Sequence, residues 1–139
     1  QGSFQAQIKV LLENIPEDNY REILFENDLP ALYKLFDVYV HTPIDTHSEA
    51  FGQTYVEALA SAIPSIFTIS GIAKEFIVHE KNALVVPFQN TAEVYCSIMR
   101  ILHDDKIRKQ LQENGLKSVA ERFGIRKMTT SLESLYLAQ

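Results

Sequence analysis

The chain has 139 residues, of which 46% are hydrophobic and 22% are charged, and its formal net charge is -5 at pH 7. This is the size of one ordinary domain, with enough apolar side chains to build a packed core. The acidic balance argues against a nucleic-acid-binding domain, which normally carries a basic face. No apolar stretch is long enough to span a bilayer.

The first third of the chain predicts a helix, a turn, a strand and a second helix. Residues 8–12 fit the end of a helix, and residues 15–19 have the composition of a turn. The apolar run at residues 23–25 predicts a short buried strand. Asp28 is a typical helix N-cap, and Pro30 stands where the first helical turn would begin.

Strands and helices alternate in the middle of the chain. Residues rich in β-branched and aromatic side chains predict strands at 38–40, 65–69 and 83–86. Helical spacing predicts helices at 53–62 and 73–78. Such alternation is typical of a parallel sheet with helices on both faces.

The last third is predicted to be helical. Thr91 and the Asp104-Asp105 pair are expected caps of two helices, Gly115 is a weak point within the second, and a last helix follows. The single cysteine, Cys96, lies in an apolar helical pattern, so we expect a core position for it.

Two junctions between a strand and the next helix combine glycine with polar or acidic residues, at residues 42–53 and 70–75. Ligands of parallel sheets bind at the carboxyl ends of the strands, where such junctions lie. In the first junction Gly52 opens a helix, and a helix start offers unpaired N–H groups and a positive dipole end to a diphosphate. Glu49 and Glu57 stand on either side and can accept hydrogen bonds from sugar hydroxyls.

This ordered series resembles the retaining glycosyltransferase family four. Glu49 and Glu57 have the spacing of that family, with Phe-Gly after the first acid and Ala after the second. The likeness covers about residues 22–137 and includes the segments 29–33, 37–40, 82–87 and 121–123. It implies an α/β fold, a Rossmann-like parallel sheet with helices on both faces, as the partial carboxyl-terminal half of a GT-B glycosyltransferase.

The resemblance also implies roles for single residues. In that family the second Glu binds the ribose of the nucleotide and the first contacts the donor sugar. Glu57 would therefore hold the ribose, and Glu49 would be the catalytic residue beside the transferred hexose. The diphosphate would meet the amides around three consecutive residues, and one aromatic neighbour completes the implied donor site: Gly52, Gln53, Thr54 and Phe51.

The second junction resembles the Gly-Gly-x-Pro-Glu turn of the family but lacks its second Gly and its Pro. Gly71 and Glu75 are the residues that this likeness adds to the donor site. We interpret Lys74, between them, as a surface lysine rather than a phosphate ligand.

The chain has no Asp-x-Asp pair to hold a divalent metal, in agreement with the metal-independent chemistry of the resembled family. We therefore expect no metal and no cofactor, and a nucleotide diphosphate sugar, UDP- or GDP-linked, as donor substrate. The implied reaction moves a hexose, with retention at the anomeric carbon, to a glycan, lipid or other acceptor. We expect a cytoplasmic protein, and peripheral contact of the full-length protein with the inner face of the membrane stays open.

Residues 1–139 are expected to be a donor-binding domain truncated at its amino-terminal end. The family's Gly-rich loop with an Arg and a Lys has no match before Ile8, and the acceptor-binding domain is absent, so we expect the isolated chain to be inactive. Two alternatives stay open: a sugar-nucleotide epimerase of similar fold, and a non-catalytic domain that binds a partner subunit.

Overall fold

A three-stranded parallel sheet forms the centre of the structure, a computed structural model that describes residues 4–137. The strands are β1 (Tyr39–His41), β2 (Ser65–Phe67) and β3 (Leu84–Val85), and they are adjacent in chain order. His41 lies opposite Phe67, which lies opposite Val85. The three strands predicted in the middle of the chain are confirmed, although each is only two or three residues long.

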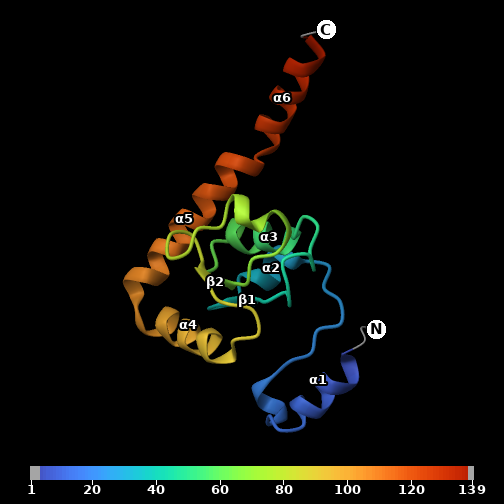
Figure 1. The fold of residues 1–139 in the computed structure, drawn as a ribbon, viewed down its shortest axis with the longest axis vertical. Coiled ribbons are helices and arrows are strands. Elements are labelled where there is room, and N and C mark those ends of the chain that lie inside the picture. Colours follow the sequence, from blue (N-terminus) through green and yellow to red (C-terminus); the bar gives the residue numbers. More distant parts are fainter. Residues whose placement is uncertain (1–3, 138–139) are drawn as a thin grey trace.

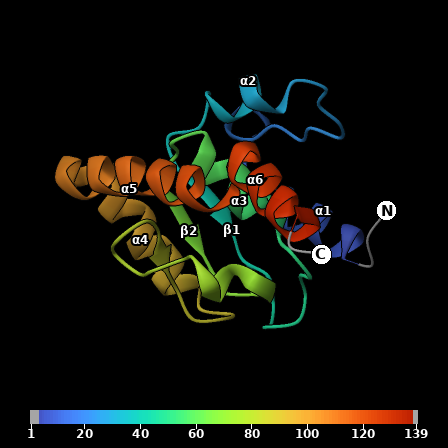
Figure 2. The ribbon, with the colours of Figure 1, turned by 90° about the horizontal axis from the view of Figure 1, so that it is seen from above.

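Helices cover both faces of this sheet, as predicted (Figure 1). Helix α3 (Gln53–Ala60) contacts β1, α4 (Thr91–His103) contacts β2, and α5 (Asp105–Phe123) packs against both helices. A short 3-10 helix, η2 (Gly71–Glu75), follows β2 where a helix was predicted. Figure 2 shows the same layers from above, with α5 lying across the molecule.

Two buried clusters show why the sheet needs helices on both sides. Successive side chains of a strand point to opposite faces. Phe67 accordingly packs in a cluster with Leu59 of α3, while Ile66 packs in a second cluster with Ile101 of α4 and Leu111 of α5. Ile66 and Phe67 are both fully buried, so β2 is the central strand of the core.

Side-chain caps fix where the helices begin. Asp28 caps α2 (Leu29–Tyr33) and Asp104 caps α5, both as predicted. The prediction for α4 was wrong by one residue: the side chain of Asn90 accepts the capping hydrogen bond, and Thr91 is the first helical residue. Each cap pairs an N–H group that has no partner inside the helix.

Gly115 does not interrupt α5, which runs through it without a break. A Cβ atom at this position would lie 2.9 Å from Cδ2 of Leu59. The missing side chain therefore lets α5 approach α3 closely, and this contact joins the first cluster to the carboxyl-terminal helices.

Two other predictions were wrong. Residues 23–25 form no strand, and Leu24 and Phe25 are 90% and 80% exposed, because the run pairs with no strand in the described part of the chain. Cys96 is exposed, since it lies on the side of α4 that faces away from the sheet.

The terminal helices contrast with this core. Neither α1 (Gln5–Leu12) nor α6 (Ile125–Leu137) has a buried residue, and α6 projects away from the sheet (Figure 1). A 3-10 turn, η1 (Glu17–Asn19), follows α1. Among residues 4–137, no helix has both the length and the apolar character needed to cross a membrane.

Candidate functional site

The start of α3 is a bare helix tip at the edge of the sheet. Gly52 precedes it in the left-handed conformation, with φ 71° and ψ 58°. A Cβ atom at this position would lie 2.5 Å from Cδ2 of Tyr55, so both the backbone angle and the available space require glycine. The first N–H groups of a helix have no carbonyl partner within it, so those of Gln53 and Thr54 are unpaired within α3 and make the tip positive.

Tyr55 anchors the tip to the sheet. Its side chain is fully buried, and its hydroxyl donates a 2.8 Å hydrogen bond to the carbonyl oxygen of Thr68, which follows β2. Burial raises the pKa of Tyr55 to about 12, so the phenol stays protonated and keeps this donor. The ring of His41 meets the Tyr55 ring edge-on at 4.8 Å, which ties the tip to the end of β1 as well.

The two predicted junctions touch each other on the Glu49 side of the tip. The N–H of Glu49 donates to Oγ of Ser70 at 3.0 Å, and the N–H of Gly71 donates to the carbonyl oxygen of Thr46 at 3.0 Å. Gly71 has φ 56°, and a Cβ atom there would lie 2.6 Å from the carbonyl oxygens of Glu49 and Ala50. Backbone contacts therefore set the position of Glu49.

A cavity of about 440 Å³ opens between these two loops. Glu49 and Lys74 line it together, so a carboxylate and an ammonium group face one space. The lining residues are Thr46, His47, Glu49, Ile69, Gly71 and Lys74. A hydroxyl-bearing ligand with an attached anion would find both an acceptor and a cation here.

His41 lies directly behind Glu49. Its Nε2 atom is 3.4 Å from Oε1 of Glu49, and this atom is buried without a hydrogen-bond partner in the described part of the chain. Burial lowers the pKa of His41, and the negative charge of Glu49 only partly opposes this effect. The imidazole is therefore neutral at pH 7, and its ring stands beside the Glu49 carboxylate.

Glu57 lies one turn into α3, on the other side of the tip. The hydroxyl of Tyr33, at the end of α2, donates to its Oε2 atom at 3.2 Å. The pKa of Tyr33 is raised, mainly by burial and further by the neighbouring Tyr39 and Glu57. A cavity of about 350 Å³ opens beside this pair, lined by Asn27, Leu29, Pro30, Tyr33, Glu57, Ala60 and Ser61.

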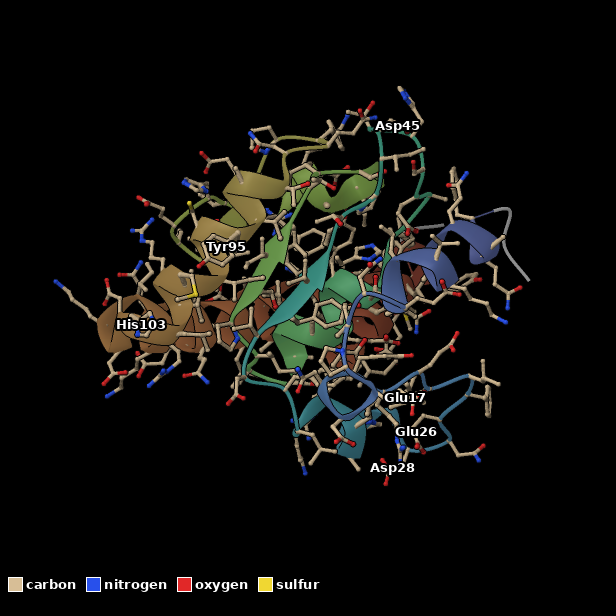
Figure 3. The ribbon with its side chains drawn as sticks, turned by 90° about the horizontal axis from the view of Figure 1, so that it is seen from below. Glu17, Glu26, Asp28, Asp45, Tyr95 and His103 are labelled. Atoms are coloured by element: carbon tan, nitrogen blue, oxygen red, sulfur yellow. The ribbon has the colours of Figure 1, made fainter. Side chains whose placement is uncertain are left out.

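Tyr39 connects the two sides. It lies in β1, and burial raises its pKa, with the negative charges of Glu57 and Glu49 adding to the effect. Both carboxylates are therefore within electrostatic reach of one phenol. In Figure 3, Asp45 marks the loop that leads to Glu49 and Asp28 marks the start of α2, and the strands run between them. The acids thus bracket the tip, but they open into separate cavities.

Two of the predicted site residues lie elsewhere. Phe51 is half-exposed, and its ring packs edge-on against Phe123 at 5.9 Å. Glu75 is exposed and lines a different cavity, of about 320 Å³, between η2 and α5. The donor-binding roles of all the predicted site residues stay predictions, and those that lie around the tip are Gly52, Gln53, Thr54, Glu57, Glu49 and Gly71.

Thr54 adds a further polar atom to the tip. Its Oγ1 is buried without a hydrogen-bond partner in the described residues. Within the same part of the chain, no three His, Cys, Asp or Glu side chains are grouped closely enough to hold a metal ion. The polar groups near the tip in this part of the chain include backbone amides, hydroxyls and carboxylates.

Three neighbours of the site were missed or given other roles by sequence reasoning. Tyr33 has the helical spacing of an apolar position, Lys74 is interpreted above as a surface lysine, and the place of His41 beside the loop indicates a loop or hydrogen-bonding role rather than metal ligation. No spacing in the sequence marks these contacts, because each joins residues on different elements. Only the strand-to-loop position of His41, at the carboxyl end of β1, was a signal that could have been used.

The comparisons with known structures agree with this architecture. The structure superposes on HepE of Anabaena, solved with UDP, with a TM-score of 0.85, covering 100% of this chain and 39% of that one at 21% identity. It also matches the carboxyl-terminal domain of a group 1 glycosyl transferase, LpcC of Francisella tularensis, with a TM-score of 0.73 at 23% identity, covering 90% of this chain and 66% of that one. The fold is that of the carboxyl-terminal domain of a GT-B glycosyltransferase.

A sequence model of the family described as glycosyl transferases group 1 matches residues 1–118. The chain belongs to this family. It is 27% identical over 120 residues to N-acetyl-alpha-D-glucosaminyl L-malate synthase of Bacillus anthracis, which covers 86% of this chain and 28% of that enzyme. The chain thus spans 28% of the length of this curated relative and 39% of the length of HepE.

Proposed function

We propose that this chain is the donor-binding half of a retaining glycosyltransferase that transfers a hexose from a nucleotide diphosphate sugar. The acceptor, a glycan or lipid, would be held by an amino-terminal domain across a cleft. Membership of the group 1 family and the UDP in the HepE structure support a nucleotide-sugar donor. An epimerase of similar fold has no comparable support.

One observation carries the proposal. A left-handed glycine begins α3 with no side-chain cap on its first amides, and the two acids near this tip, Glu49 and Glu57, line separate cavities. The tip can take the diphosphate, because free N–H groups and the helix dipole favour anions. The Glu57 cavity can take the ribose, and the Glu49 cavity can take the sugar.

The same arrangement suits the chemistry of transfer. As the sugar–phosphate bond breaks, negative charge grows on the departing diphosphate and the sugar becomes oxocarbenium-like. Preorganised amides at the tip, and Lys74 beside the sugar cavity, would stabilise the departing charge. Glu49 would accept hydrogen bonds from sugar hydroxyls and hold the anomeric carbon toward an acceptor on the face that the diphosphate leaves, so that the configuration is retained.

The finer assignments belong to this proposal as well. Either UDP or GDP fits the proposed contacts, because ribose and diphosphate are common to both. A parent enzyme working in the cytoplasm, in contact with the inner face of a membrane when its acceptor is a lipid, fits a nucleotide-sugar donor. Phe51 and Glu75 would join the site only if their loops move toward the donor.

Replacing Glu57 by Gln in the complete two-domain enzyme tests the proposal. The change removes the charged acceptor of the ribose hydroxyls, so we expect affinity for UDP or GDP, measured by calorimetry, to fall about 10- to 100-fold. Glu113→Gln, an exposed change on α5, is the matched control and should bind like the unchanged enzyme. Unchanged nucleotide affinity in Glu57→Gln would contradict the ribose-binding role of Glu57 and favour the two alternatives, an epimerase of similar fold or a non-catalytic domain.

A further inference from the structure

His41 stands beside the proposed sugar contact, yet the proposed function gives it no task. It ends β1, where its carbonyl oxygen accepts the N–H of Thr68 at 3.3 Å. Its ring is held edge-on by Tyr55 at 4.8 Å and stacks on Tyr39 at 6.4 Å. These contacts aim Nε2 at Glu49, from which it is 3.4 Å away.

We infer that His41 is a positioning residue, whose Nε2–H donates to Glu49 and holds that carboxylate toward the donor sugar. The inference rests on the proposed function and adds a residue to it. At 3.4 Å the contact is long for a hydrogen bond, and Nε2 has no hydrogen-bond partner in the described residues. Hydrogen bonds of this kind are often long in free enzymes and shorten when the substrate is bound.

A purely structural role explains less of this geometry. The strand contact of His41 uses its backbone, and an apolar side chain would fill the space between Tyr39 and Tyr55 equally well. A buried N–H without a partner costs free energy. The cost is recovered when Nε2 bonds to Glu49, which is the charged group facing it, while Tyr39 and Tyr55 present aromatic rings.

The bond would act through orientation. A carboxylate that accepts one hydrogen bond from a fixed ring has fewer orientations to lose when a sugar hydroxyl binds to its other oxygen. Because the ribose and diphosphate lie on the other parts of the site, the effect of His41 should be confined to the sugar.

The test compares His41→Leu and His41→Gln in the complete enzyme. Calorimetry would measure the affinity for each nucleoside diphosphate and for its sugar nucleotide separately: UDP against UDP-glucose, and GDP against GDP-mannose. We expect His41→Leu to weaken binding of the sugar nucleotide about 10-fold, and to change binding of the nucleoside diphosphate less than about 2-fold. His41→Gln, whose amide can donate from a similar place, should recover most of the loss.

Equal effects of His41→Leu on both ligands, no effect on either, or no rescue by Gln would overturn the inference. An unchanged enzyme that binds neither nucleotides nor sugar nucleotides would instead overturn the proposed function, and so would full nucleotide affinity in Glu57→Gln. The two failures are therefore distinguishable.

A double-mutant cycle keeps the test decisive if His41→Leu does not fold. The cycle uses Glu49→Gln, a donor-less His41→Met, and the double variant. If His41 acts through Glu49, the double variant should bind the sugar nucleotide no more weakly than Glu49→Gln alone. Additive losses would mean that His41 acts independently of Glu49 and would overturn the inference.

Discussion

The two sides of the helix tip are built in different ways. On the Glu49 side, loop contacts fix the backbone: the N–H of Glu49 donates to Oγ of Ser70, and Gly71 packs against the carbonyl oxygens of the neighbouring loop, while the carboxylate lies 3.4 Å from Nε2 of His41. On the Glu57 side, the carboxylate meets a single side chain, the phenol of Tyr33. One side is fixed by loop geometry, and the other by a hydrogen bond between two side chains.

This difference indicates which part of the site can adapt. A loop built from backbone contacts around a left-handed glycine tolerates few substitutions at that glycine, because a Cβ atom cannot be accommodated there. A hydrogen bond between side chains on two helices can open by rotation about side-chain bonds. Substitutions on the Glu49 side should therefore lower the free energy of unfolding more than substitutions on the Glu57 side.

The largest effect on stability is expected from Gly71→Ala. The new Cβ would combine a left-handed backbone with contacts of 2.6 Å to two carbonyl oxygens, so we expect a loss of about 3 kcal/mol in the free energy of unfolding. Urea unfolding measures it. The matched control is Gly124→Ala, at a φ of -64°, with an expected loss below about 1 kcal/mol. If both variants lose less than about 1 kcal/mol of unfolding free energy, the contacts of Gly71 do not make the Glu49 side sensitive to substitution.

A smaller effect is expected from Tyr33→Phe, which removes the hydrogen bond to Glu57. We expect the free energy of unfolding to fall by about 1 kcal/mol. Nucleotide affinity should stay the same or rise slightly, because the Glu57 carboxylate no longer accepts a hydrogen bond from Tyr33. Tyr95→Phe removes an exposed hydroxyl on α4, labelled in Figure 3, and serves as control. If Tyr33→Phe lowers the free energy of unfolding as much as Gly71→Ala does, the Glu57 side is not the more tolerant of the two.

The smallest effect concerns the pH dependence of stability. Burial lowers the pKa of His41 in the folded state, so the unfolded chain binds a proton that the folded chain refuses. Stability should fall as the pH drops below about 6.5, the ordinary value for histidine, toward the lower folded pKa. Thermal unfolding between pH 7.5 and 5.5 measures this loss.

His41→Gln should flatten that profile, because its side chain does not titrate. His103→Gln, an exposed change at the end of α4, should keep the profile of the unchanged protein because His41 is intact. If His41→Gln loses stability on acidification as the unchanged protein does, the neutral imidazole behind Glu49 is not the cause.

Much of the fold could be predicted because its signals are local. The alternation of residue types placed β1, β2 and β3, and the capping chemistry of Asp28 and Asp104 placed two helix starts. Gly52 with its flanking acids could likewise be located, because a left-handed cap and a helix start depend on neighbours in the chain.

Other features depend on which elements meet. An apolar triplet at 23–25 has the composition of a strand, but a strand needs a partner, and none of the described strands pairs with it. Cys96 has helical spacing, but its side of α4 faces solvent. Glu75 follows the expected turn, yet η2 directs it toward α5 rather than the Glu49 cavity.

Local sequence was enough for the order of β1, β2 and β3, for the caps Asp28 and Asp104 and for the acidic pair around Gly52, because each of these follows from contacts within a few residues. Only the tertiary structure decided that the acids open into separate cavities, and that Tyr33 and His41 stand behind them. Tyr33 and Glu57 are 24 positions apart in the chain, and no periodicity reaches across that separation. Such contacts are set by the packing of α2 and β1 around α3.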